Sequence, residues 1–128
     1  MDADGLHDLF APMGAVRVKR MFGGYGVYAD DLIFALQVDG EVLLKGDAQT
    51  AEAFAQAGCA QWTYASKTGR AAAMPYWRMP DACFDEPEEL ARWAGLALEA
   101  SRRADKAKRD KASAPPARRA GTRRRAGS

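Results

Sequence analysis

The sequence is poor in the residues that build metal sites and disulfide frameworks, since its 128 residues include one histidine and two cysteines. Cys59 and Cys83 are too few for a secreted disulfide scaffold, and they lack the spacing of a zinc site. We expect both to be reduced, half-buried thiols. The sequence therefore predicts a protein that holds no metal and no cofactor.

Long apolar runs are also missing. No stretch approaches the roughly 18 uninterrupted apolar residues that a membrane helix needs. The start, Met-Asp-Ala-Asp-Gly, is acidic, whereas a signal peptide starts with basic residues. The sequence therefore predicts a cytoplasmic protein with no membrane association, and its length allows a single hydrophobic core.

Candidate catalytic residues are few. His7 lies beside Asp8 in a short predicted helix, where we expect a surface residue. Neither cysteine has a basic neighbour in the sequence that would activate it as a nucleophile. The acidic cluster over residues 85–89 could be read as paired catalytic carboxylates, but helix capping explains it more simply. We therefore expect a protein that is not an enzyme.

Charge is divided along the chain. Residues 1–101 contain 8 Lys and Arg against 15 Asp and Glu, a net charge of −7, whereas residues 102–128 contain 11 against 2, a net charge of +9. No large apolar side chain follows Ala104, so the sequence predicts a folded domain over residues 1–104 and a disordered basic tail over residues 105–128. Residues 105–112 could extend the preceding helix part of the time, because Lys and Ala are good helix formers.

The tail offers candidate nucleic-acid contacts, because its arginines could neutralise phosphates and release counterions. These candidates are Arg118, Arg119, Arg123, Arg124 and Arg125. Nothing in the tail reads bases, so such attraction to DNA or RNA would be non-specific. The alternative is that Ala and Arg, which GC-rich codons encode, accumulated in a tail under little selection.

The apolar periodicity changes several times before the tail, and each change predicts an element. Helical spacing predicts helices between Asp4 and Gly14, between Gly46 and Gly58, and from an Asp85 cap, with Glu88 completing a capping box, to Arg103. Alternation and turn signals predict strands over residues 16–21, 27–28, 32–38, 41–45, 61–66 and 72–78. The order α-β-β-β-β-α-β-β-α predicts an α+β two-layer sandwich, with an antiparallel sheet of about six strands and helices on one face.

A glycine-rich segment over residues 22–26 is a candidate anion or partner surface, because successive glycine amides can form an anion nest and basic residues lie nearby. It lacks the Gly-Lys-Ser/Thr ending of a phosphate-binding loop and precedes a strand instead of a helix. The alternative is that these glycines permit a bulge and close packing between strands. The candidate residues are Arg17, Lys19, Arg20, Gly23, Gly24, Tyr25 and Gly26.

Aromatic residues on the last two predicted strands form a candidate interface. Alternation places Trp62 and Tyr64 on one face and separates Tyr76 from Trp77, so some of these rings must lie away from the core. They could form core contacts and cross-strand pairs. They could also form a surface for a protein partner or for self-association.

The run from Arg20 to Tyr28, RMFGGYGVY, resembles the opening signature of the TfoX/Sxy N-terminal domain. Later stretches fit the same family in the same order, and they are Leu44-Lys45, Phe54, Thr63-Tyr64, Met74 to Trp77 with Pro80, and the helix over residues 89–102. The resemblance covers roughly residues 6–104 and implies an α+β domain related to the secretion-chaperone-like fold. In the better-known members it implies a regulator that promotes transcription of DNA-uptake genes alongside the cyclic-AMP receptor protein. Those members carry a second, helical domain at the place where this sequence has its basic tail.

Three hypotheses follow for the function. In the first, the chain is a non-enzymatic regulatory or protein-interaction module, its domain binds a protein partner or itself, and its tail adds non-specific attraction to nucleic acid. In the second, it is a nucleic-acid-binding accessory protein that acts mainly through the tail. In the third, it is a small anion- or nucleotide-binding domain that uses the glycine-rich segment.

Overall fold

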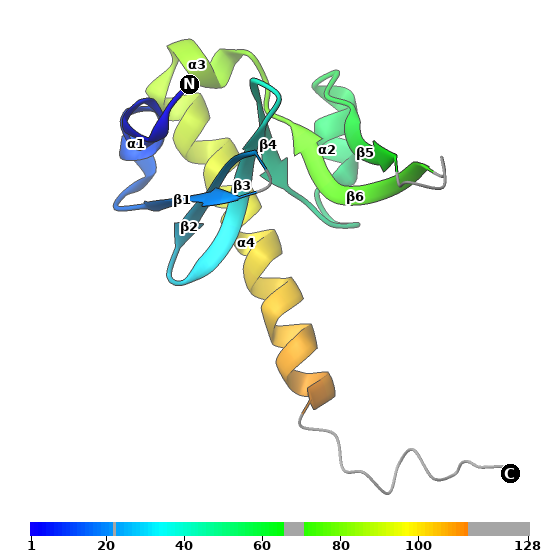
Figure 1. Ribbon diagram of the computed structural model, residues 1–128. Coiled ribbons are helices and arrows are strands. Elements are labelled where there is room, and N and C mark those ends of the chain that lie inside the picture. The colour runs from blue at the N-terminus through cyan, green and yellow to red at the C-terminus, as the bar shows by residue number, and fades with distance from the viewer. Residues whose placement is uncertain (22, 66–70, 113–128) are drawn as a thin grey trace, which may run out of the picture.

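A computed structural model describes residues 1–21, 23–65 and 71–112, and within them six strands form one antiparallel sheet (Figure 1). The strands are β1 (Arg17–Met21), β2 (Gly24–Ala29), β3 (Leu32–Val38), β4 (Glu41–Lys45), β5 (Gln61–Ala65) and β6 (Ala71–Arg78), in the sheet order β1-β2-β3-β4-β6-β5. The helices are α1 (Ala3–Phe10), the 3-10 turn η1 (Ala11–Met13), α2 (Ala51–Gln56), α3 (Ala82–Asp85) and α4 (Pro87–Ala112). The predicted α+β class, antiparallel sheet and element order are confirmed, with η1 and α3 as additions.

The main core lies between one face of the sheet and the helices. The apolar stripe of α4, including Leu90 and Trp93, is buried there together with Phe34 of β3. Phe54 of α2 stacks on the Trp77 ring of β6, with ring centroids 5.5 Å apart, and also contacts Trp93. Helices α1, α2 and α4 therefore pack on the same side of the sheet.

A β-bulge in β3 supplies apolar side chains to both faces of the sheet. Val27 pairs with Ala35 and the next residue, Tyr28, pairs with Ile33. Phe34 therefore has no partner residue on β2. Phe34 and Ala35 both enter the core beneath the helices, whereas the flanking Ile33 is displaced to the other face. The bulge explains why the strand lacks simple alternation.

The helix starts differ from the predicted ones. Asp2, not Asp4, caps α1, because its carboxylate Oδ1 accepts a hydrogen bond from the Gly5 amide at 2.9 Å. The predicted Asp85 cap is wrong: Asp85 ends the separate turn α3, and α4 starts at Pro87. Proline is favoured at the first position of a helix, where its missing N–H leaves no bond unmade.

Helix α4 runs along one side of the sheet, and its C-terminal part extends past the strands (Figure 1). Two contacts near the point where it leaves the strands are made by Ser101, whose hydroxyl donates to the Ile33 carbonyl at 2.6 Å, and by Arg102, whose guanidinium pairs with Asp30 at 2.6 Å. Residues 105–112 are helical, as the alternative for this segment predicted, and so the helix ends beyond the expected boundary at Ala104. Residues 113–128 and their five candidate arginines lie outside the described residues.

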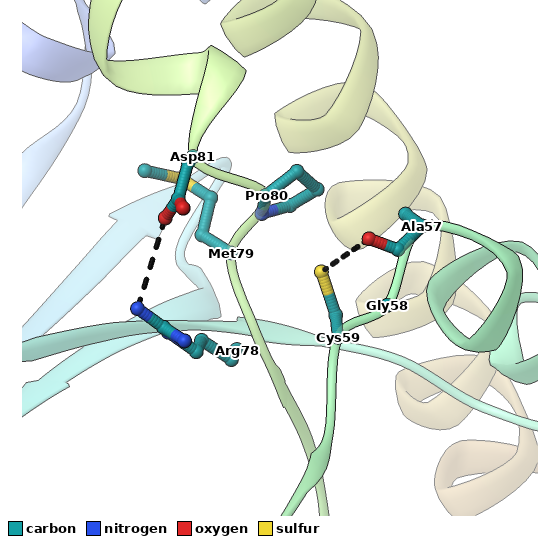
Figure 2. Close-up of a pocket in the computed structure, with 7 residues that line it drawn as sticks. All are labelled: Ala57, Gly58, Cys59, Arg78, Met79, Pro80 and Asp81. Atoms are coloured by element: carbon teal, nitrogen blue, oxygen red, sulfur yellow. Dashed lines mark hydrogen bonds and ion pairs between the residues drawn. The ribbon is translucent and has the colours of Figure 1, made fainter.

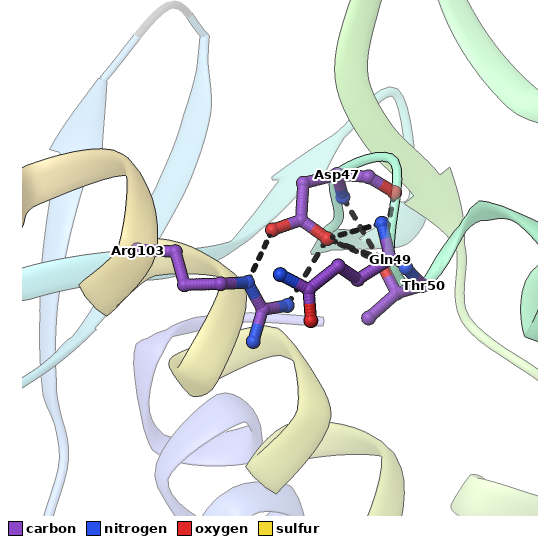
Figure 3. Close-up of polar contacts among 4 residues, drawn as sticks. All are labelled: Asp47, Gln49, Thr50 and Arg103. Carbon is purple, nitrogen blue, oxygen red and sulfur yellow. Dashed lines mark hydrogen bonds and ion pairs between the residues drawn. The ribbon is translucent and has the colours of Figure 1, made fainter. Parts of the chain in front are cut away.

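The turn before α2 is tied to α4 by a polar cluster (Figure 3). The Asp47 carboxylate accepts two hydrogen bonds from the Arg103 guanidinium, at 2.6 and 3.0 Å. It also accepts the backbone amides of Gln49 and Thr50, at 3.1 and 3.3 Å. One carboxylate thus organises the turn and connects it to a helix 56 residues later in the chain.

Candidate interaction groove

The face of the sheet opposite the helices carries a second apolar cluster. Leu36, Leu43 and Tyr76 are buried at its centre. Partly buried side chains surround them, namely Met21, Ile33, Val38, Trp62 and Met74. Every member of this cluster lies on a strand. The sheet thus buries apolar side chains on a face where no member of the cluster comes from a helix.

This face is hollowed into a groove of about 690 Å³. Its lining is apolar and aromatic and comes from five strands: Met21, Tyr28, Ile33, Leu36, Val38, Trp62, Met74 and Tyr76. We call it the sheet groove. Pockets of a few hundred cubic ångströms with mostly apolar walls are typical of binding sites.

Two lysines lie over aromatic rings of the sheet groove. The Lys19 ammonium is 5.2 Å from the centroid of the Tyr28 ring, and the Lys45 ammonium is 5.2 Å from that of Tyr76. Ammonium groups at this distance from a ring are attracted by its π electrons. Arg17 also approaches Tyr28, at 6.0 Å, but it forms an ion pair with Asp31 at 2.7 Å. Two lysines therefore lie at the groove, although residues 1–101 carry a net charge of −7.

Burial changes the titration of two groups in this region. Burial lowers the pKa of the Lys45 ammonium, and the nearby charge of Asp47 partly opposes that change. Burial, with a smaller contribution from Tyr28, raises the pKa of the Tyr76 hydroxyl to about 12. Tyr76 is therefore protonated at neutral pH and can donate a hydrogen bond to a bound group.

The structure divides the predicted anion surface between the two faces of the sheet. Arg17 and Lys19 alternate along β1 with Val18, which packs on the helix-side core, and so they belong to the groove face. Arg20 pairs with Tyr25, and Tyr25 packs against the helix-side core. Arg17 and Lys19 thus reach the sheet groove, whereas Arg20 and Tyr25 lie on the opposite face.

The glycines of the same segment permit close packing. A Cβ atom on Gly24 would lie 1.8 Å from the Gln37 carbonyl oxygen. A Cβ atom on Gly26 would lie 2.9 Å from the Met21 sulfur and 3.0 Å from Ile33 Cδ1. Because consecutive N–H groups of a strand point in opposite directions, β2 does not offer converging amides as a nest would. The geometry favours the close-packing interpretation, with Gly26 allowing Met21 and Ile33 to approach over it.

The aromatic candidates separate as alternation predicted. Trp77 lies in the helix-side core, whereas Tyr76 and Trp62 line the sheet groove. The backbone of Tyr64 pairs with Ala72 at the outer strand β5. Two of the four candidate residues, Trp62 and Tyr76, thus line the groove, Trp77 belongs to the core, and the side chain of Tyr64 lies outside the described part of the structure.

Most of the groove lining was missed by sequence reasoning. The sequence candidates do not include six of the eight lining residues, which are Met21, Tyr28, Ile33, Leu36, Val38 and Met74. The available signal was the presence of apolar residues on both faces of β3, which indicates a strand covered on both sides.

Both cysteines are free, and both are buried, where the sequence predicted half-buried thiols. Cys59 lies beside a hollow of about 60 Å³, room for about two waters. Figure 2 shows its thiol directed at the Ala57 carbonyl, 3.9 Å away, and Arg78 paired with Asp81 at 3.7 Å. Burial raises the pKa of the Cys59 thiol, and it raises that of Cys83 to about 12. Neither cysteine is an activated nucleophile.

Within residues 1–21, 23–65 and 71–112, no three His, Cys, Asp or Glu side chains gather as they would around a metal ion. No helix of that part of the chain is both long and apolar enough to cross a bilayer.

The chain is similar to known proteins over most of this domain. A family model of the TfoX N-terminal domain matches residues 8–101. Protein Sxy of Escherichia coli (strain K12) is 28% identical over 94 residues, which are 73% of this chain and 44% of that protein. DNA transformation protein TfoX1 of Aliivibrio fischeri (strain ATCC 700601 / ES114) is 28% identical over 90 residues, 70% of this chain and 43% of that protein. The chain thus spans less than half the length of these curated relatives. Because the family model covers well over half of the sequence, the chain belongs to the TfoX N-terminal domain family.

Proposed function

We propose that this chain is a non-enzymatic regulatory module whose sheet groove binds a protein partner. The observation that carries the proposal is the groove itself, about 690 Å³ in volume and lined by apolar and aromatic strand residues. A hollow of this size with mostly apolar walls and a few polar groups is the usual form of a binding site. Tyr and Trp, both present in the lining, are enriched at protein interfaces.

A binding role also agrees with the chemistry of the buried polar groups. Tyr76 and Cys83 both have pKa values raised to about 12, so both are protonated at neutral pH. A protonated phenol or thiol is a weak base and a weak nucleophile. Of the two, Tyr76 lines the groove, and its protonated hydroxyl is available to donate a hydrogen bond to a bound group.

The process that the partner serves is proposed from the family. One relative is named a DNA transformation protein, and Sxy matches the same part of the chain. We place this chain in the regulation of DNA transformation, as a component that acts through a protein contact.

The test replaces Val38, a groove residue at the end of β3, with aspartate in the native host. A charge in the groove leaves a carboxylate desolvated when a partner docks, so we expect DNA uptake to fall by about tenfold or more, as in a strain that lacks the gene. Val38→Thr keeps the shape and serves as the matched control, with melting temperatures measured for both variants. Met74→Asp repeats the test on another strand if Val38→Asp fails to fold.

Two results would contradict the proposal. If the Val38→Asp and Met74→Asp proteins fold and their strains take up DNA at the wild-type level, the groove is excluded as the docking site of the partner. Wild-type uptake in the deletion strain would exclude a role in transformation.

A second candidate function is non-specific attraction of nucleic acid by the tail, and the net charge of +9 over residues 102–128 favours it. Deleting residues 113–128 removes five arginines. If each arginine neutralises one phosphate, the slope of log affinity for duplex DNA against log salt should lose about 4 to 5 units.

The matched controls replace the five tail arginines with lysine or with glutamine. Lysine preserves the charge, and so the salt slope should survive it, whereas glutamine should behave like the deletion. If the affinity for DNA and its salt slope are unchanged after the deletion, residues 113–128 do not bind DNA, and this candidate function is contradicted.

A further inference from the structure

We infer that the occupant of the sheet groove is an amphipathic segment of another protein, with an apolar row for the groove and Asp or Glu side chains that pair with Lys19 and Lys45. This inference rests on the proposed function and adds the chemistry of the partner. Its basis is the juxtaposition of an apolar hollow with two lysines held over aromatic rings of its own lining.

The positions of the two lysines define where the acidic groups belong. Lys19 lies over Tyr28 of β2, and Lys45 lies over Tyr76 of β6. Lys19 is on β1 and Lys45 is on β4, so β2 and β3 lie between the two lysines, and the lining continues past Lys45 onto β6 and β5. A segment seated between them meets one cation on each side.

An acidic residue at the other end gives the partner a direction. Glu41 shares the groove face of β4 with Leu43 and Lys45, and it pairs with Val38 across the strands. A carboxylate next to Glu41 would be repelled, whereas one next to the ammonium groups of Lys19 and Lys45, over Tyr28 and Tyr76, would be attracted. The acidic side chains of the partner therefore lie toward the two tyrosines.

The tail of the chain is a poor occupant. Residues 113–128 contain five arginines and no large apolar side chain. They would bring like charge to Lys19 and Lys45, and they have nothing with which to fill an apolar groove. Electrostatic complementarity excludes basic segments as strongly as it favours acidic ones.

A second copy that inserts one of its own exposed side chains is also a poor occupant. Among the described residues, the large apolar side chains exposed to solvent are Met1 and Phe84, at 53% and 46%. Each is one side chain and cannot replace an apolar row in a groove lined by eight residues. No exposed apolar side chain among the described residues therefore fills the groove of a second copy, and a pairing of two grooves face to face is decided by the light-scattering measurement below.

The test selects ligands from a library of random peptides displayed on phage, with the full chain as bait. We expect the selected peptides to be rich in apolar residues and to carry a net negative charge. Their affinity, measured by fluorescence anisotropy, should fall by about tenfold in the double variant Lys19→Gln and Lys45→Gln. It should survive Lys19→Arg and Lys45→Arg, which keep both charges.

The matched control is Lys106→Gln with Lys108→Gln, which removes two lysines from the projecting part of α4. It should leave the affinity unchanged. Peptides without an excess of acidic residues, peptides insensitive to the loss of Lys19 and Lys45, or no binding peptides at all would overturn the inference.

The outcome also separates this inference from the proposed function. Peptides that lose affinity in Val38→Asp but are not acidic would refute the chemistry of the partner and leave the groove as a docking site. Peptides indifferent to Val38→Asp would refute the docking site itself. A dimer in light scattering that Val38→Asp dissociates would make a second copy the occupant, and this too would overturn the inference.

Discussion

The substitution Gly24→Ala is expected to destabilise the domain severely, lowering the free energy of unfolding by about 3 kcal/mol or more. The added Cβ atom would lie 1.8 Å from the Gln37 carbonyl oxygen and 3.0 Å from its carbonyl carbon. Both obstructing atoms belong to the backbone of β3, so no side-chain rotation can relieve the clash and the sheet must deform. Urea denaturation followed by circular dichroism measures the loss.

The matched control is Gly95→Ala. Gly95 lies within α4, and a Cβ atom there would meet no atom within 4 Å. Alanine is favoured over glycine inside a helix, so this variant should gain about 0.5 to 1 kcal/mol. Equal, small effects at both positions would contradict the close approach of β2 to β3.

Asp47→Ala is expected to lower the free energy of unfolding by about 2 kcal/mol, from the lost turn capping and the lost charge-assisted hydrogen bonds. Asp47→Asn should keep most of the bonds to the backbone amides of Gln49 and Thr50 while removing the charge that faces Arg103. The asparagine variant therefore measures the ion pair, and the alanine variant measures the ion pair together with the turn. As a control, Asp110→Ala breaks an exposed pair with Lys106 and should cost less than about 0.5 kcal/mol.

The Asp47 contribution should depend on pH. The hydrogen bond from Arg103 is the main cause that holds the pKa of Asp47 below its usual range, although partial burial opposes it. A carboxyl whose pKa is lowered by folding stabilises the protein above its unfolded pKa of about 3.9, and this stabilisation is lost as the pH falls through the folded value. The stability difference between wild type and Asp47→Asn should thus be largest near neutral pH and shrink below about pH 4. A difference that stays constant from neutral to acid pH would contradict the ion pair.

Local sequence patterns predicted the order of the elements because each pattern depends on neighbours along the chain. Asp39-Gly40 marks the β3–β4 turn, where both residues have positive φ, 52° and 80°. Alternation alone separated Tyr76 from Trp77. The predicted start of α4 is wrong because Asp85 and Glu88 also fit a capping box. Pro87 is the better signal, since proline is favoured at the first position of a helix.

The bulge in β3 and the sheet groove could not be predicted in the same way. The bulge depends on how Val27 and Tyr28 pair with a strand across a turn, and a single strand does not encode that register. The groove depends on the pairing of β4 with β6, which brings Tyr76 beside Lys45 from 31 positions away in the sequence. Lys19 and Tyr76 were identified separately, as an anion contact and an aromatic contact, and the sheet places both on one face.

In our proposal the partner docks in the sheet groove and not on the side of the sheet that the helices cover. Methyl NMR spectra of the full chain, recorded with the tightest of the selected peptides, test this claim most directly. We predict intermolecular contacts to the methyl groups of Met21, Ile33, Leu36 and Met74, with no contacts to those of Leu6 and Leu90 beneath the helices. Contacts confined to α1 and α4, with an unperturbed groove, would contradict the account.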